Sequence, residues 1–519
     1  MKLALIFLSL ASAVLCQSKS VAVLTTSGVL EGVQDNNGVR SFKGIRYGVS
    51  PTGELRWEPP VPFFSARRQN ATTLGPSCVQ QFAFAVAAIE QALFNNPGGP
   101  PPPESEDCLF LNVWAPGSGG KKPVVVWIHG GSLAFGTASL PAYDGTSIAT
   151  NQDVIIVTIN YRTNVFGFPG SPDLPIKGNN LGFLDQELAL KWVQLNIANF
   201  GGDPKKVTIM GQSAGSSSVS AAVVRSVSNP PFRAAIMLSG ALTSRSPAPS
   251  FTSFNALATG VNCTQAPGPK RLQCLKNVPT AAIKAYIDGP TSGSFSTVVD
   301  NSTIFDDPLE RIRTKQTARV PVLLGNMQDD GDFFTLGQTN LTAFLQTFAG
   351  GAVPVAIVRA LYPGLSDDSR IIAEVFKDVA FLCPAGLWSN ALVGSGISSV
   401  FRYTYGAVFP DLQVFPNAGA WHGTELLELF GTYNRSTVTP AEVTLSQTWQ
   451  TAFANFIKNP NADPSPEWVK YVPGNTTKTL ARIAYNGNVD TNNFVELAES
   501  DSIDGPCAAV WNKLLDFRP

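Results

Sequence analysis

One serine in this chain lies in a sequence pattern suited to nucleophilic catalysis. Residues Val207 to Ser216 read Val-Thr-Ile-Met-Gly-Gln-Ser-Ala-Gly-Ser, a β-branched run that ends in Gly-x-Ser-x-Gly centred on Ser213. The pattern predicts a strand that turns sharply into a helix, with the serine hydroxyl exposed on the turn. Because so short a pattern also occurs by chance, its interpretation depends on a base and an acid elsewhere in the chain.

The choice of a base is narrow because the chain has only two histidines. A serine hydroxyl is a poor nucleophile unless a base removes its proton, and a carboxylate must hold that base in the right tautomer. His129 follows a strand-like run and precedes Gly130 and Gly131, whose backbone N–H groups suit an oxyanion-binding loop. We therefore predict by elimination that His422 is the base. The alternative for His422 is a hydrogen-bonded histidine with a structural role.

Asp330 is the preferred partner for this base. It lies just past a strand-like run and gives the chain order Ser213, Asp330, His422. The α/β-hydrolases use this order, whereas other serine hydrolases order the same residue types differently. Asp329 and Asp332 are neighbouring alternatives for the acid.

The bulk composition predicts a folded, globular protein. Of its 519 residues, 44% are hydrophobic and 14% are charged, which suffices for a large core. We expect a single domain over residues 17–519, because no linker divides the chain. The formal net charge of -1 provides no basic field for phosphate backbones, so nucleic acid is not an expected partner.

Residues 1–16 have the composition of a secretory signal peptide. One lysine precedes an apolar stretch, Leu3 to Leu10, that is too short to span a bilayer, and cleavage is expected after Ala13 or Cys16. The remainder contains no membrane-spanning stretch, so we expect a secreted protein without a stable membrane anchor. Five N-glycosylation sequons agree with this location, at Asn70, Asn301, Asn340, Asn434 and Asn475, and a further candidate begins at Asn262.

Cleavage after Cys16 leaves an even number of cysteines. The six are Cys78, Cys108, Cys263, Cys274, Cys383 and Cys507. In an oxidising compartment they are expected to form three disulfides, and free buried thiols are the alternative. Two histidines and the absence of a Cys-x-x-Cys motif argue against a metal site, so we predict neither metal nor cofactor.

The elements that must carry these residues follow an α/β pattern. Continuous apolar runs, typical of strands covered on both faces, occur at 124–128, 154–160, 207–210, 234–238, 320–324 and 400–405. Between two of them, Leu184, Leu188, Trp192 and Leu195 recur at helical spacing within Gly182 to Ile197. Strand, helix and strand in succession predict a parallel sheet with helices on both faces.

Several blocks of the chain together resemble the type-B carboxylesterase and lipase family, which includes the cholinesterases and fungal lipases. The N-terminal block is Phe42-Lys43-Gly44-Ile45-Arg46-Tyr47 with Gly53-Glu54-Leu55-Arg56-Trp57. The second signature is Ser105-Glu106-Asp107-Cys108-Leu109-Phe110-Leu111-Asn112, and the nucleophile block is Gly178 to Ser216. The resemblance, which runs nearly end to end, implies an α/β-hydrolase fold with large loop insertions.

The resemblance also implies roles for individual residues. Ser213 would be the nucleophile, Asp330 the acid and His422 the base. The implied oxyanion donors are the backbone N–H groups of Gly131, Ser132 and Ala214, and Ser239 is placed where the family has a buried serine touching acid and base. The implied disulfides are Cys78 to Cys108, Cys263 to Cys274 and Cys383 to Cys507. Arg56 and Glu106 match a family ion pair, for which a solvated surface pair is the alternative.

Three residues depart from the family pattern. Asp330 stands where Glu is usual, so the acid is one methylene shorter and its loop must sit closer to His422. Ser132 replaces the third glycine of the oxyanion loop and adds a side chain near the acyl group. Gln212 precedes the nucleophile where Glu is common, so one negative charge beside Ser213 is missing.

The loop between Cys78 and Cys108, hereafter the first disulfide loop, bears on the substrate. It lacks a tryptophan that could face a quaternary ammonium, which weakens a cholinesterase interpretation, and Phe94 is its nearest aromatic equivalent. Phe82 to Phe94 is expected to be helical, with an apolar stripe formed by Phe82, Val86, Ile89 and Leu93. This stripe predicts either a helix packed permanently on the rim of the site, which we favour, or a lid that opens at a lipid surface.

We therefore expect a secreted serine carboxylesterase that hydrolyses neutral, fairly apolar small-molecule esters through an acyl-enzyme. The alternative is a lipase or sterol esterase with a mobile lid, acting on lipid-like esters. A non-catalytic adhesion protein of the same fold is a remote alternative, because Ser213, Asp330 and His422 are all intact.

Overall fold

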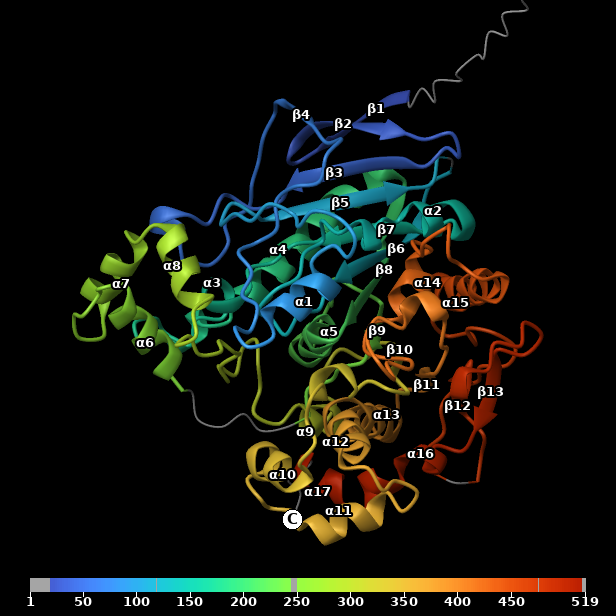
Figure 1. Cartoon of the computed structure of the whole chain (residues 1–519). Coiled ribbons are helices and arrows are strands. Elements are labelled where there is room, and N and C mark those ends of the chain that lie inside the picture. Colours follow the sequence, from blue (N-terminus) through green and yellow to red (C-terminus); the bar gives the residue numbers. More distant parts are fainter. Residues whose placement is uncertain (1–18, 118, 244–249, 475, 516–519) are drawn as a thin grey trace, which may run out of the picture.

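A computed structural model describes residues 19–515 of the chain, except 118, 244–249 and 475 (Figure 1). The expected signal peptide, residues 1–16, and the sequon at Asn475 lie outside the described residues. Within the described part, the chain forms one 13-stranded sheet flanked by helices. The strands are β1 (Lys19–Thr25), β2 (Gly28–Gln34), β3 (Arg40–Arg46), β4 (Arg68–Asn70), β5 (Phe110–Ala115), β6 (Lys122–Ile128), β7 (Ile155–Ile159), β8 (Gly202–Gln212), β9 (Ala234–Leu238), β10 (Val322–Met327), β11 (Val400–Tyr405), β12 (Leu480–Ile483) and β13 (Val495–Ala498).

The sheet has a parallel centre and antiparallel edges. The strand order is β1-β2-β3-β5-β7-β6-β8-β9-β10-β11-β12-β13, and β4 pairs with β2. All pairs from β7 to β12 in this order are parallel, whereas the pairs from β1 to β7 and the pair of β12 with β13 are antiparallel. The parallel centre confirms the α/β architecture predicted from the apolar runs.

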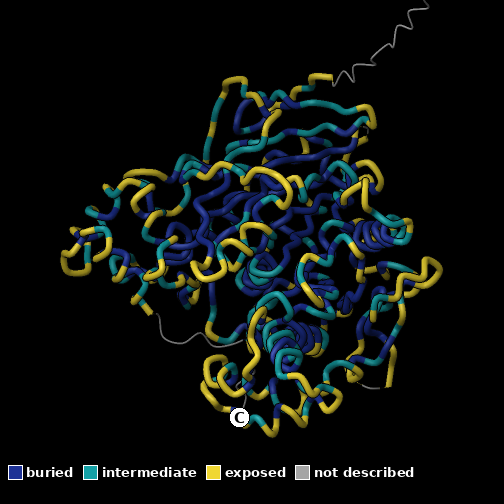
Figure 2. Tube along the Cα trace, in the orientation of Figure 1, coloured by how far each residue is buried: buried dark blue, intermediate teal, exposed yellow. Residues whose placement is uncertain are grey.

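Side chains of the central strands alternate between two cores. Val124, Val126 and Ile128 of β6 belong to one apolar cluster, and Val125 and Trp127 belong to the other. This alternation follows from the two-residue period of a strand, and burial on both sides explains why these strands have continuous apolar sequences. Figure 2 shows the buried chain concentrated in the middle of the molecule.

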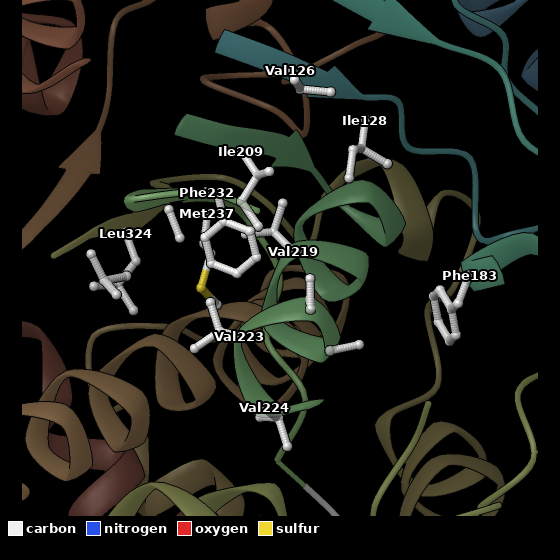
Figure 3. Packing of buried hydrophobic residues seen from close by; sticks show 14 of the residues in the cluster. Val126, Ile128, Phe183, Ile209, Val219, Val223, Val224, Phe232, Met237 and Leu324 are labelled. Atoms are coloured by element: carbon white, nitrogen blue, oxygen red, sulfur yellow. The ribbon is translucent and has the colours of Figure 1, made fainter. Parts of the chain in front are cut away.

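Helices cover both faces of the sheet (Figure 1). They are α1 (Ala87–Phe94), α2 (Thr146–Gln152), α3 (Asn164–Gly167), α4 (Leu181–Asn196), α5 (Ala214–Arg225), α6 (Thr252–Gly260), α7 (Pro269–Lys276), α8 (Thr280–Ile287), α9 (Pro308–Arg313), α10 (Leu341–Ala349), α11 (Val355–Leu361), α12 (Asp368–Lys377), α13 (Cys383–Gly394), α14 (Glu425–Phe430), α15 (Pro440–Lys458), α16 (Asp501–Pro506) and α17 (Asn512–Leu515). Figure 3 shows Val219 and Val223 of α5 packed toward Ile209 of β8 and Met237 of β9, so the helix that follows β8 is held by the core.

Three disulfides tie the loop insertions to this framework. They join Cys78 to Cys108, Cys263 to Cys274 and Cys383 to Cys507, the pairings that the resemblance implies. Among the described residues, no helix combines the length and the apolar character needed to cross a bilayer.

A buried ion pair anchors the first disulfide loop. Arg56 donates two hydrogen bonds to Glu106, from Nε at 2.8 Å and Nη2 at 2.5 Å, and both side chains are buried. Arg56 Nη1 also donates to the carbonyl oxygens of Leu275 and Val278 at 3.0 and 2.6 Å. The pair is therefore not the solvated surface pair considered as an alternative, and it connects the loop to the segment around α7.

Candidate active site

Ser213 lies on the sharp turn between β8 and α5 that the sequence pattern predicts. Its φ of 57° falls in a region that residues other than glycine rarely adopt. The two motif glycines make this turn possible. A Cβ on Gly211 would lie 2.4 Å from the carbonyl oxygen of Gly215, and a Cβ on Gly215 would lie 2.0 Å from that of Ile128. Any larger residue at either position would therefore push the strand and the helix apart.

Asp330 and His422 are in direct contact. Asp330 follows β10, His422 precedes α14, and His422 Nδ1 lies 2.7 Å from Asp330 Oδ1. Because a carboxylate only accepts hydrogen bonds, Nδ1 carries a hydrogen, and in the neutral ring the lone pair is therefore on Nε2. His422 Nε2 has no hydrogen-bond partner among the described residues, and both His422 and Ser213 line the same cavity. The arrangement places an unprotonated imidazole nitrogen where it can receive a proton from a group in that cavity.

The Asp330 carboxylate is fixed by two further donors. Its Oδ2 accepts a hydrogen bond from Ser239 Oγ at 2.9 Å and another from the backbone N–H of Met327 at 2.7 Å. Asp330 itself is fully buried. Ser239 thus contacts Asp330, as the resemblance implies, but no hydrogen bond joins it to His422 among the described residues.

The two alternative acids point elsewhere. Asp329 Oδ2 accepts a hydrogen bond from the backbone N–H of Ala420 at 2.8 Å. Asp332 is paired with Arg370, yet burial raises its pKa to about 7. Among these neighbouring aspartates, Asp330 is the one in contact with His422.

His129, the other histidine, is buried against Tyr161. It is buried, its ring stacks on Tyr161 with centroids 4.4 Å apart, and its Nδ1 lies 2.8 Å from the carbonyl oxygen of Gly130. Burial lowers the pKa of His129 to about 4, so the ring is neutral at physiological pH. This environment agrees with the assignment of His129 to the oxyanion loop rather than to the base.

The predicted oxyanion donors lie at the cavity that Ser213 lines or directly follow Ser213 in the chain. Gly131 and Ser132 line the cavity, and Ala214 is the first residue of α5. Among the described residues, the backbone N–H groups of these three residues have no hydrogen-bond acceptor. Such unpaired N–H groups next to a nucleophile can bind a developing oxyanion. Ser132 has a φ of 55°, a conformation that the usual glycine would adopt with less strain.

The cavity has a volume of about 250 Å³ and mostly apolar walls. Its aromatic lining consists of Phe94, Phe135, Tyr143, Phe333, Phe334 and Trp421, and its aliphatic lining of Leu93, Leu140, Leu412, Val414, Leu426 and Leu427. Gln212 also lines it, and the buried Nε2 of this side chain has no hydrogen-bond partner among the described residues. The missing negative charge next to Ser213 is therefore replaced by a neutral amide.

The first disulfide loop differs from the helical stripe predicted for it. The helix α1 begins at Ala87, and Phe82 lies outside it, stacked on Phe135 with ring centroids 4.8 Å apart. Val86 and Ile89 are 43% and 45% exposed, as is Phe84 at 62%. Leu93 and Phe94 line the cavity. Phe82 and Leu93, the two ends of the predicted stripe, therefore contact other parts of the protein, whereas Val86 and Ile89 in its middle are exposed. The short helix packs on the rim of the cavity through its last turn.

Several residues beside the site were not predicted from the sequence. Phe334 and Phe381 flank the His422 ring at centroid distances of 4.9 and 4.7 Å. Glu425, three residues after His422, is fully buried, and its two carboxyl oxygens have no hydrogen-bond partner among the described residues. Burial, with a smaller effect of the nearby Asp330 charge, raises the pKa of Glu425 to about 8. The position of Glu425 one helical turn after His422 is the only sequence signal that could have marked it.

Comparisons with known proteins identify the family of this chain. The family described as "Carboxylesterase family" matches residues 19–351. Carboxylesterase 1C of Rattus norvegicus is 32% identical over 463 residues, covering 83% of this chain and 84% of that protein. Chlorogenic acid esterase of Aspergillus niger is 31% identical over 478 residues, covering 88% and 86%. Secreted lipase 5 of Gibberella zeae is 29% identical over 487 residues, covering 85% and 86%. This chain therefore belongs to the carboxylesterase family of α/β-hydrolases and is an ester-hydrolysing enzyme.

Proposed function

We propose that the protein is a secreted serine esterase that hydrolyses neutral, fairly apolar carboxylic esters through an acyl-enzyme, with Ser213, Asp330 and His422 as its triad. The observation that carries this proposal is the 2.7 Å contact of His422 with Asp330 at a cavity that Ser213 also lines. The buried partners of Asp330 support it, because they hold the carboxylate where it can stabilise an imidazolium.

The proposed reaction follows from these positions. Ser213 Oγ attacks the ester carbonyl carbon while His422 Nε2 takes its proton, and Asp330 stabilises the imidazolium. The N–H groups of Gly131, Ser132 and Ala214 bind the oxyanion, and the alcohol leaves with the proton from His422. Water then attacks the acyl-enzyme while His422 takes its proton, and His422 returns this proton to Ser213 Oγ as the bond to the acyl group breaks and the acid leaves.

The proposed substrate class is inferred from the side chains that line the cavity. Aromatic and aliphatic side chains form most of the lining, so burial of apolar acyl or alcohol groups contributes to binding at about 25 cal/mol per Å². Gln212 adds no charge next to Ser213, which favours neutral esters over cationic ones. Esters of about the size of a 250 Å³ cavity are therefore the expected substrates.

Ser213→Ala tests the proposal. The variant is expected to lose at least about a thousandfold in kcat toward p-nitrophenyl butyrate, because the remaining groups cannot form the acyl-enzyme. An organophosphate should label the wild type at Ser213 and leave the variant unlabelled. Retained turnover in Ser213→Ala would refute the triad, and an unlabelled, inactive wild type would favour a non-catalytic binding protein.

A lipase or sterol esterase is the second candidate, favoured by the exposed apolar residues Phe84, Val86 and Ile89 on the first disulfide loop. A lid that opens at a lipid surface would present such residues to lipid. A series of p-nitrophenyl esters of increasing acyl length, measured below and above the solubility limit, separates the candidates. A rise in rate at the interface supports the lid, and a smooth saturation curve supports the esterase with a rigid rim.

Secretion rests on the signal-like residues 1–16, the three disulfides and the sequons. Four of the sequon asparagines, Asn70, Asn301, Asn340 and Asn434, are exposed, so a glycosyltransferase could reach each of them. Expression in a eukaryotic host followed by treatment with peptide N-glycosidase should lower the apparent mass of protein recovered from the medium. Protein retained in the cells at the full-length mass would contradict secretion.

A further inference from the structure

Asp329, the residue before the proposed acid, connects two segments: residues 328–332, which follow β10 and are called the acid loop, and residues 419–424, which precede α14 and are called the base loop. The backbone N–H of Asp329 donates to the carbonyl oxygen of Ala420 at 3.2 Å, and the Asp329 carboxylate accepts the N–H of Ala420 at 2.8 Å. Asp329 also forms a parallel bridge with Trp421. Residues adjacent to Asp330 and His422 are thus held together by main-chain and side-chain bonds, independently of the contact between Asp330 and His422.

The connection leaves no room for a side chain at residue 419. A Cβ on Gly419 would lie 2.4 Å from Asp329 Oδ2, and Gly419 has a φ of +62°, which favours glycine. The base loop therefore approaches the Asp329 carboxylate closely at two successive residues, Gly419 and Ala420.

Helix α12 supports the acid loop from its other side. Arg370 forms ion pairs with Asp332 and, at 3.7 Å, with Asp329. Between these aspartates, a Cβ on Gly331 would lie 1.9 Å from the carbonyl oxygen of Ala373. The acid loop is therefore confined between α12 and the base loop.

Such confinement matters because the acid is an aspartate. The shorter side chain can reach His422 only if its loop lies close to the base loop, and a displacement of about 1 Å can cost about a hundredfold in rate. We propose that Asp329 is a positioning residue that sets the separation of Asp330 and His422, an inference that rests on the proposed triad. Its carboxylate acts on the reaction only through the two loops.

The test compares three substitutions of Asp329 in the full-length protein. Asp329→Ala should lower kcat for p-nitrophenyl butyrate by about 10- to 100-fold with KM changed by less than about threefold, because alignment is lost and the cavity is retained. Asp329→Asn keeps an oxygen acceptor for the Ala420 N–H and should retain kcat within about threefold. In Asp329→Ser, the serine side chain is too short to reach Ala420, so this variant should behave like Asp329→Ala. It replaces Asp329→Ala in the test if that variant does not fold.

A matched control separates positioning from general stability. Asp300 is also a buried loop aspartate, whose carboxylate accepts the N–H groups of Ser302, Thr303 and Ile304. Asp300→Ala should lower the melting temperature without lowering kcat at 25 °C. An equal loss of kcat in Asp300→Ala and Asp329→Ala would reduce the effect to stability and overturn the proposal.

A spectroscopic readout does not depend on turnover. The hydrogen shared by His422 Nδ1 and Asp330 should give a far-downfield proton NMR signal, which can be assigned because the chain has only two histidines. The signal should shift upfield or vanish in Asp329→Ala and persist in Asp329→Asn and Asp300→Ala. If Ser213→Ala is inactive but Asp329→Ala keeps both kcat and the signal, the positioning role fails while the triad stands. If Ser213→Ala stays active, the triad itself fails.

Discussion

Ser239 Oγ donates a hydrogen bond to Asp330 Oδ2 at 2.9 Å, which joins the end of β9 to the acid loop that follows β10. Both residues are completely buried. The two strands are parallel neighbours, so their carboxyl ends lie together at one edge of the sheet. Parallel pairing thus brings a hydroxyl 91 residues away to the carboxylate that contacts His422.

Removal of this hydroxyl should weaken both folding and catalysis. Ser239→Ala leaves one acceptor position of a buried carboxylate without its donor, so we expect a loss of about 1–3 kcal/mol in the free energy of unfolding. A decrease in kcat of about three- to tenfold is expected as well. Urea unfolding and steady-state kinetics measure the two effects. Ser389→Ala, which removes a buried hydroxyl that bonds within α13, is the control and should leave kcat unchanged.

Substitution of a motif glycine, even by alanine, should destabilise the protein. Gly215→Ala would place a Cβ 2.0 Å from the carbonyl oxygen of Ile128, so β6 and α5 must separate. We expect a loss of about 3 kcal/mol or more, together with loss of activity. Gly364→Ala, at a position with no atom within 4 Å of the added Cβ, should be neutral or stabilising. Thermal unfolding of both variants measures the difference in stability. Equal melting temperatures would contradict the predicted clash at residue 215.

Glu425 should make the folded state less stable as the pH rises. Burial raises its pKa from 4.5 to about 8, so the folded protein retains a proton that the unfolded chain releases. Stability therefore falls from pH 4.5 to about 8 and is then unaffected by this group. Glu425→Gln, which cannot ionise, should show a smaller fall in melting temperature between pH 5 and pH 8. The exposed Glu467→Gln is the control, and identical pH slopes for wild type and Glu425→Gln would be the contrary result.

The disulfides should differ in their contributions to stability. The loop closed by Cys383 and Cys507 spans 124 residues, whereas that closed by Cys263 and Cys274 spans 11. In the chain-entropy description, the longer loop stabilises the fold by about 2 kcal/mol more. Double serine variants of each pair, compared by urea unfolding, should reproduce this order. The reverse order would show that effects in the folded state outweigh loop entropy.

The sequence predicted the centre of the fold better than its edges. The runs 234–238 and 400–405 coincide with β9 and β11, because strands covered on both faces have continuous apolar sequences. The antiparallel strands β1 to β3 were not predicted. One face of such strands is exposed, as at Leu24, so their apolar residues do not form a continuous run.

For the site, local sequence patterns predicted candidate residues, whereas residues that reach the site only through tertiary packing left no signal in the sequence. Ser213 was predicted from its motif, and Asp330 and His422 from chain order and from the scarcity of histidine; the contact of Asp330 with His422 is compatible with these predictions. Phe381 and Arg370 could not be found in this way, because they contact the site only through the packing of α12 and the segment that follows it. The helix predicted to begin at Phe82 begins at Ala87 in the structure, because Phe82 stacks on Phe135 instead.

The buried pair of Arg56 and Glu106 gives the first disulfide loop a fixed base and a replaceable middle. The disulfide joins the two ends of the loop and Glu106 lies near its second end, whereas Leu93 and Phe94 reach the cavity from between them. We expect that residues 83–94 of the loop can be replaced without disturbing Ser213, Asp330 and His422, whereas Gln80 and Gln81 must stay because they bond to Gly136 and Ala134. Exchange of this one cassette is therefore expected to change acyl selectivity without replacing any residue of the proposed triad.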